Sequence, residues 1–112
     1  LRNGGSTMAK SWAHKKAQWK AAGPGGRTEV RLQSGRRLDA LSRDGYRATE
    51  VEFGNFGRML KAAGRLAESG AQAPVLAVPY RNIRAAAAAM RAAGVSGWIR
   101  DINGTTKFYI KC

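Results

Sequence analysis

Five of the seven acidic residues in this chain fall within one short window, between residues 29 and 54. They are Glu29, Asp39, Asp44, Glu50 and Glu52. The chain has 20 Lys and Arg residues and a net charge of +13, so acids that served only solubility would be spread along it. Clustering them costs like-charge repulsion unless a cation or a shared proton offsets it. The window therefore predicts a catalytic or metal-binding site.

Three of these acids are positioned by two predicted strands, over 36–41 and 46–53, that are joined by a tight turn. Side chains two residues apart on a strand share a face, so Glu50 and Glu52 project together. We expect Asp39, on the antiparallel neighbour, to share an ion with Glu50. Carboxylate oxygens suit Mg²⁺ or Mn²⁺, and Glu52 then completes the metal site or acts as the general base toward water. The alternative is an ordinary solvated strand whose acids pair with arginines.

The other elements follow from apolar periodicity and from Gly and Pro residues that end each segment. Helices are predicted over 8–22, 56–69 and 82–93, and strands over 28–33, 36–41, 46–53, 74–78, 97–102 and 105–111. The order α-β-β-β-α-β-α-β-β predicts a single α+β domain over 8–112, after a Gly- and Ser-rich linker remnant at 1–7. Because the chain begins with Leu1, we expect a fragment of a longer polypeptide. No apolar run is long enough to span a membrane.

The basic composition predicts a polyanionic partner, with nucleic acid the first choice. The single cysteine, Cys112, allows neither an internal disulfide nor a cysteine zinc cluster. Eight basic residues are expected to bind the substrate: Arg36, Arg37, Lys15, Lys16, Lys20, Lys61, Arg81 and Arg84. Among them, Arg37 is expected to share a face with Asp39, near the scissile phosphate.

Three other side chains have two possible roles each. His14, the only histidine, is expected at the surface or in contact with phosphate, in preference to acting as a catalytic base. Trp12 and Trp19 recur at near-helical spacing, which favours a place in the core over stacking on bases.

The order α-β-β-β-α-β, with an Asp on the second strand and Glu-X-acid on the third, resembles the PD-(D/E)XK restriction-endonuclease-like superfamily. The resemblance covers about residues 8–80, followed by a further helix and a C-terminal β-hairpin. It implies that Asp39 and Glu50 bind the metal and that Glu29 matches an additional upstream acid. Glu52 stands where most members have the lysine that orients the attacking water. Some members use an acid there; Lys61 is a candidate substitute, and an inactivating replacement at 52 is the remaining alternative.

The implied function is a metal-dependent endonuclease that hydrolyses phosphodiester bonds in tRNA or DNA. Its size and charge also resemble the C-terminal nuclease domains of bacterial polymorphic toxins, including contact-dependent growth inhibition toxins. That resemblance implies delivery by a secreted or cell-surface protein, action in the target-cell cytoplasm and neutralisation by an acidic immunity protein. Two alternatives stay open. One is a cytoplasmic Holliday-junction resolvase-like or repair nuclease, and the other is a non-catalytic, basic nucleic-acid-binding module.

Overall fold

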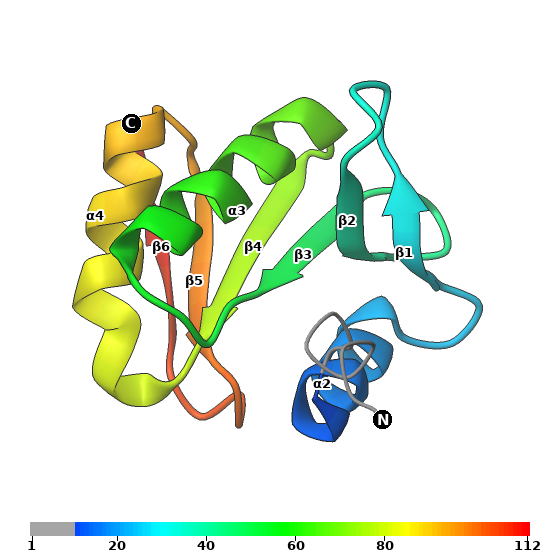
Figure 1. Cartoon of the computed structure of the whole chain (residues 1–112), viewed down its shortest axis with the longest axis horizontal. Helices are drawn as coiled ribbons and strands as arrows, with labels where there is room; N and C mark the ends of the chain where they lie inside the picture. Colours follow the sequence, from blue (N-terminus) through cyan, green and yellow to red (C-terminus); the bar gives the residue numbers. More distant parts are fainter. Residues whose placement is uncertain (1–10) are drawn as a thin grey trace, which may run out of the picture.

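The computed structural model describes residues 11–112 as a mixed six-stranded sheet with three α-helices (Figure 1). The elements are α2 (Trp12–Ala22), β1 (Arg27–Arg31), β2 (Arg37–Leu41), β3 (Arg47–Val51), α3 (Phe56–Ser69), β4 (Ala73–Val78), the 3₁₀ turn η1 (Tyr80–Asn82), α4 (Ile83–Ala93), β5 (Gly97–Asp101) and β6 (Lys107–Ile110). This order matches the one predicted from the sequence, and the protein is a mixed α+β domain. The linker predicted at 1–7 lies outside the described residues.

The strands lie in the sheet in their order along the chain, from β1 to β6. β1, β2 and β3 form an antiparallel meander, and β5 and β6 form an antiparallel hairpin. Between them, β3, β4 and β5 are parallel, since α3 and α4 carry the chain back across the sheet. β4 is therefore central, and five of its six residues are buried, which fits its continuous apolar sequence.

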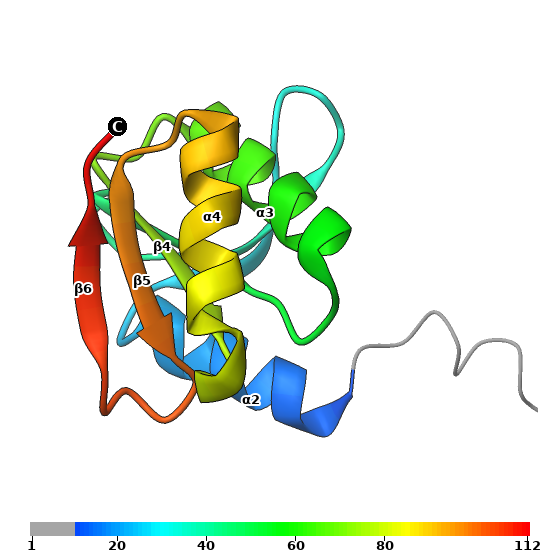
Figure 2. The same cartoon turned by 90° about the vertical axis from the view of Figure 1, so that its left-hand side faces the viewer.

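The main core lies between the sheet and the pair α3 and α4, which cover the same face (Figures 1 and 2). Met59 and Leu66 of α3 and Met90 of α4 pack there against Leu76 of β4. Asn55 caps the start of α3 by accepting a hydrogen bond from the Arg58 amide, and Gly70 ends the helix in the left-handed conformation. The predicted bounds of α3 are thus confirmed.

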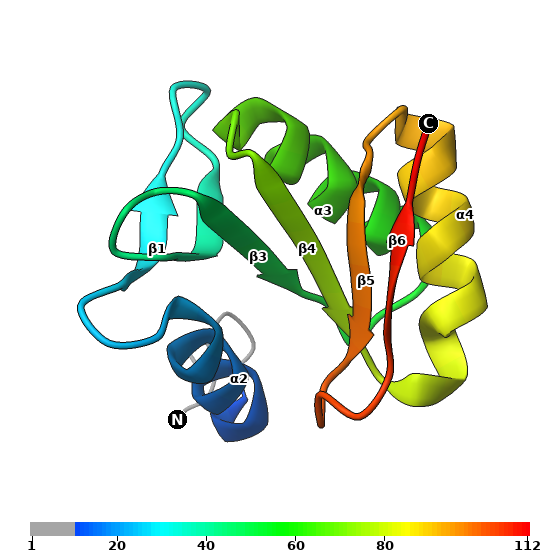
Figure 3. The ribbon, with the colours of Figure 1, turned by 180° about the vertical axis from the view of Figure 1, so that it is seen from behind.

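The opposite face of the sheet is only partly covered, because a single helix, α2, lies on it. Ala17 of α2 packs against Val51 and Ala77, and Ala21 packs against Ala40. Seen from that side, no described helix lies in front of β4, β5 and β6 (Figure 3). Small alanine side chains let α2 lie close to β2 and β3, and they position the remaining residues of this helix beside the acid-rich strands.

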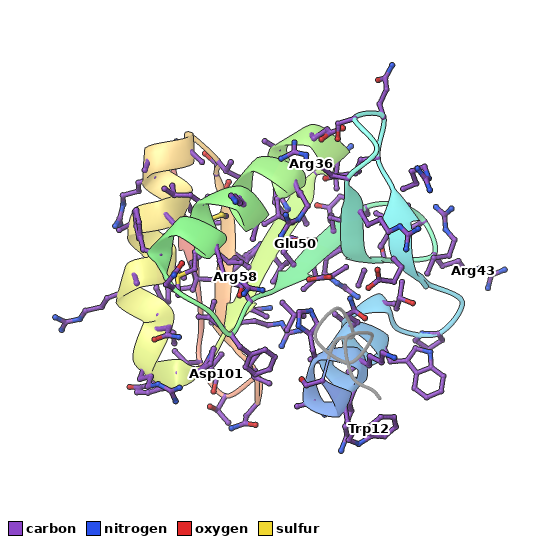
Figure 4. The ribbon with its side chains drawn as sticks, in the orientation of Figure 1. Trp12, Arg36, Arg43, Glu50, Arg58 and Asp101 are labelled. Carbon is purple, nitrogen blue, oxygen red and sulfur yellow. The ribbon has the colours of Figure 1, made fainter. Side chains whose placement is uncertain are left out.

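Two predictions about α2 were wrong. The described helix begins at Trp12, because the side chain of Ser11 accepts a hydrogen bond from the His14 amide and so caps the helix there. Trp12 and Trp19 are not core residues: they are 76% and 74% exposed, and Figure 4 shows Trp12 pointing away from the sheet. The buried stripe of the helix is instead made by alanines and by Gln18, which gives almost no amphipathic signal in the sequence.

Candidate active site

Asp39 is buried at the point where strands β2 and β3 stop pairing through their backbones. The two strands pair at Ala40–Thr49 and at Leu41–Ala48. Beyond Ala40 the carboxylates replace the ladder: the Asp39 amide donates to Glu50 Oε2 at 2.7 Å, and the Val51 amide donates to Asp39 Oδ2 at 2.8 Å. The side chain of each acid therefore bonds to the backbone of the neighbouring strand, and the two acids lie close together as predicted.

Gln18 of α2 joins Asp39 to a second acid, Glu29 of β1. Its side-chain nitrogen donates to Asp39 Oδ1 at 2.7 Å and to Glu29 Oε2 at 2.6 Å. His14, one helical turn earlier, brings Nε2 within 3.4 Å of Asp39 Oδ2, so this histidine faces the acids rather than open solvent. We call Glu29, Asp39 and Glu50, with Gln18 and His14, the acidic cluster.

The backbone of Glu29 is strained. Its φ of 54° is the only positive value for a non-glycine residue in the described part of the chain. A Cβ in the left-handed region costs about 1–2 kcal/mol, and such strain persists where the surrounding structure imposes it, often at functional sites. Glu29 lies between Thr28 and Val30, which pair with the two neighbours of Asp39, and it accepts the Gln18 hydrogen bond.

This strain can be measured by comparing Glu29→Gly with Glu29→Ala. Both variants lose the carboxylate, but only glycine adopts a positive φ without a steric penalty. We expect the glycine variant to have the larger free energy of unfolding, by about 1 kcal/mol, in urea denaturation. Equal stability of the two variants would contradict a strained Glu29.

Glu50 is 1% exposed and pairs with Arg65 of α3, whose Nε donates to Oε1 at 2.7 Å. Burial, and then the charge of Asp39, raise the pKa of Glu50 to about 7 against the opposing effect of Arg65. At neutral pH its carboxyl group is thus close to half protonated. Such a value suits a group that exchanges protons with a reactant.

Glu52, the third predicted catalytic acid, is also buried but turns toward the start of α3. Oε2 accepts from the Gly54 amide at 2.7 Å and lies 3.3 Å from Arg58 Nε (Figure 4 labels Arg58). A Cβ on Gly54 would lie 2.8 Å from that oxygen, so a larger residue would displace the Glu52 side chain. The predicted shared face of Glu50 and Glu52 is confirmed, because both contact arginines of α3. The contacts of Glu52 hold the loop between β3 and α3.

A metal ion here would be held by few protein ligands. In residues 11–112 no three His, Cys, Asp or Glu side chains form a group that could hold a metal ion. Mg²⁺, however, usually keeps several waters and is bound through one or two carboxylates together with phosphate oxygens. Asp39 with Glu50 offers two carboxylates, and each carboxylate has about four lone-pair positions. Glu50 uses two of them, for the Asp39 amide and for Arg65. The residues present fit an ion of that kind.

The predicted substrate-binding residues do not all gather at one place. Arg36 pairs with Glu68 at 2.6 Å near the C-terminal end of α3, whereas Glu50, also labelled in Figure 4, pairs with Arg65. Arg81 and Arg84 line a cavity of about 340 Å³ at the start of α4. Arg37, Lys15 and Lys61 are exposed on β2, α2 and α3. Lys16 and Lys20 lie on the side of α2 that faces the β5–β6 hairpin.

Sequence reasoning missed Gln18 and Arg65 and placed His14 at the surface. The sequence did contain a signal for Gln18. It lies four residues after His14 on a predicted helix, so the two side chains share one face of that helix. No comparable signal marked Arg65, because which helical arginine reaches a buried acid depends on how α3 crosses the sheet. The pairing of Glu50 and Glu52 with arginines is what the alternative of an ordinary strand predicted, although both acids are buried rather than solvated.

Within residues 11–112, no helix combines the length and the apolar character needed to cross a bilayer. Comparison of the chain with family models, with curated proteins and with solved structures found no match in any of the three.

Proposed function

We propose that this protein is a metal-dependent endonuclease that cleaves nucleic-acid phosphodiester bonds at the acidic cluster. The observation that carries the proposal is the Gln18 amide shared by Asp39 and Glu29, with Glu50 bonded to the Asp39 backbone. Ionising three neighbouring carboxylates is costly; Arg65 offsets part of that cost at Glu50, and a metal ion would offset more. The strained Glu29 backbone indicates that this arrangement is imposed by the fold.

In this proposal Asp39 and Glu50 hold Mg²⁺ or Mn²⁺, with Glu29 adjacent. The ion would supply charge stabilisation to the phosphate and acidify a bound water. The chain itself supplies orientation: Gln18 fixes the Asp39 carboxylate, and Arg65 fixes that of Glu50. Glu50, whose pKa is raised to about 7, is the group here that exchanges a proton near neutral pH. Glu52, locked to Gly54, positions the loop that precedes α3.

The restriction-endonuclease-like topology is part of the same proposal. The antiparallel meander of β1 to β3, the crossover through α3 and the parallel β4 support it. So does the position of Asp39 and Glu50 on neighbouring strands at the point where their ladder opens. The role as a toxin domain with an acidic immunity partner, delivered to a target-cell cytoplasm, rests on charge and size.

The test is to incubate the protein with supercoiled plasmid and, separately, with total tRNA. Each mixture contains Mg²⁺, Mn²⁺ or a chelator. We expect cleavage of at least one substrate with metal and none with the chelator. Cleavage that survives the chelator would overturn the metal-dependent mechanism. A symmetric dimer in sedimentation, with cleavage confined to four-way junctions, would instead favour a resolvase.

A second candidate function is a nucleic-acid-binding module without catalysis. The observation that favours it is that Glu50 and Glu52 each lie beside an arginine, Arg65 and Arg58 respectively. In that case the acids serve only to hold α3 against β3. Binding of plasmid or tRNA without cleavage under either metal would select this function over the endonuclease.

A further inference from the structure

The half of the sheet that α2 leaves open is strongly basic. Arg47 of β3, Trp98 and Arg100 of β5 and Lys107 of β6 line a continuous hollow beside α2. The strand register explains their meeting: Trp98 and Arg100 are two residues apart and share a face, and Arg100 pairs with Lys107 across the hairpin. Lys16 and Lys20 close the hollow from α2. We call this region, lined by these six residues, the basic groove.

The basic groove consists of two adjoining cavities of about 520 Å³ and about 380 Å³. Lys20, Arg100 and Lys107 line both of them, so the two form one continuous channel between α2 and the β5–β6 hairpin. Such volumes are in the range that accommodates small ligands and nucleotide-sized groups. Figure 3 shows the side of the sheet on which the channel runs.

Within residues 11–112, the walls of the basic groove carry cations and no acidic side chain. Neither cavity is lined by an Asp or a Glu. The hydrogen bonds of the two arginines go to carbonyl oxygens: Arg47 donates to Ala21 and Arg100 to Asp101, both at 3.3 Å. Burial, and then the charge of Arg47, lower the pKa of Arg100 against the opposing effect of the neighbouring Asp101. Two guanidinium groups held near each other, with no carboxylate lining the groove between them, create a place for an anion.

Aromatic rings lie beside these cations. Trp98 packs edge-on against Tyr109, with ring centroids 5.3 Å apart, and the Lys107 ammonium lies 4.9 Å from the Trp98 ring centroid. Tyr109 is half exposed. Cations that track a phosphate backbone, next to aromatic rings on which bases stack, are the combination used to bind single strands without sequence preference. An acidic protein partner would use the cations but has less use for the exposed rings.

We propose that the basic groove binds a single-stranded stretch of nucleic acid, with its phosphates on Arg47, Arg100 and Lys107 and a base against the Trp98–Tyr109 pair. The groove lies on the side of α2 opposite to Asp39: Gln18 faces the acids, whereas Lys16 and Lys20 face the hairpin. A strand held there passes beside α2, so the groove serves as a second contact for the same nucleic acid. Only this role as a second contact rests on the proposed endonuclease function; binding of a single strand in the groove does not.

The test measures binding and not cleavage. Fluorescently labelled 20-nucleotide oligo-dT and oligo-U are titrated in the presence of chelator with the wild type, with Arg47→Gln/Arg100→Gln and with Lys20→Gln/Lys107→Gln. We expect each double variant to weaken binding by about tenfold to a hundredfold at physiological salt. The slope of log K against log salt should fall by about 1.4, since two phosphate contacts are lost. Arg47→Lys/Arg100→Lys should recover most of the salt slope.

The matched control is Arg31→Gln/Arg91→Gln, which removes the same charge from exposed positions on β1 and α4, outside the groove. Its affinity should change less than threefold. If control and groove variants weaken binding equally, only net charge matters and the groove proposal is overturned. If both groove variants bind as the wild type does, it is also overturned. Thermal melts show whether each variant is folded, and the two pairs of groove variants share no residue.

The outcomes separate this proposal from the endonuclease. Cleavage by the wild type together with unchanged binding by the groove variants leaves the endonuclease standing and removes the groove. Loss of binding in the groove variants, in a protein that cleaves no substrate, establishes the groove and favours the binding module. A tight complex with poly-glutamate, stronger than with oligo-dT, would assign the groove to an acidic protein and overturn the nucleic-acid proposal.

Discussion

Asp39→Asn is expected to abolish metal-dependent cleavage of plasmid and tRNA while leaving the protein folded. Asparagine has the same shape, and its one oxygen keeps the hydrogen bond from either Gln18 or the Val51 amide, which donate to different oxygens of Asp39. It removes the negative charge, however, and with it the main ligand for the proposed ion. Loss of several kcal/mol of transition-state stabilisation corresponds to roughly a thousandfold lower kcat/KM. Initial rates with saturating Mn²⁺ would measure it.

The matched control is Glu68→Gln, which makes the same change of charge near the C-terminal end of α3, where Glu68 pairs with Arg36. Its kcat/KM should stay within threefold of the wild type. Full activity of Asp39→Asn would place the chemistry elsewhere and remove the acidic cluster from the mechanism. If the chain acts as a toxin, its expression in bacteria should arrest growth, and expression of Asp39→Asn should not.

Arg65→Met is expected to lower the free energy of unfolding by about 3 kcal/mol at pH 8, because it leaves Glu50 buried and ionised without a partner. The loss should shrink sharply at pH 5.5. The pKa of Glu50 is raised from 4.5 to about 7, so its proton is bound in the folded state between those values. The stability that this proton gives is complete below about pH 4.5 and is lost as the pH rises through about 7. Without Arg65 the pKa rises further, and the loss continues to higher pH.

Urea denaturation at pH 5.5 and pH 8 measures both effects. Arg36→Met is the matched control, since it removes an arginine from the exposed pair with Glu68. It should change stability far less, with no difference between the two pH values beyond that of the wild type. A loss for Arg65→Met that is equal at both pH values would show that Glu50 does not titrate in this range. Glu50→Gln in the Arg65→Met background should flatten the pH dependence.

The fold was largely accessible from the sequence because its elements carry local signals. Asn55 and Gly70 at the ends of α3, the apolar run of β4 and the turn at Asn103-Gly104 are signals of this kind, and the elements that they mark appear in the predicted order. α2 is the exception. Its buried face consists of small alanines and Gln18, so the large tryptophans that suggested a core face point to solvent. The large size of the tryptophans wrongly suggested burial, because the helix lies too close to the sheet for large side chains to fit between them.

The candidate site could be predicted from the sequence only in part, because only some of its contacts depend on local signals. Spacing on neighbouring strands was enough to bring Asp39 and Glu50 together, since a hairpin fixes its own register. It was not enough to find Arg65 or Gln18, which arrive from helices separated from these acids along the chain. Nor did it show the basic groove, because Arg47, Arg100 and Lys107 come from three strands whose order in the sheet follows from two crossovers.

The amino-acid sequence by itself determined the order of helices and strands, the excess of positive charge and the pairing of residues 39 and 50 across one turn. All three depend on composition or on neighbours within a few residues. Only the tertiary structure decided which helix covers each face of the sheet, and therefore which acids meet Gln18, which meet arginines and which cations are left without a carboxylate. Those choices depend on how whole elements pack, and packing of α2 over half a sheet is a property of the assembled core rather than of any local segment.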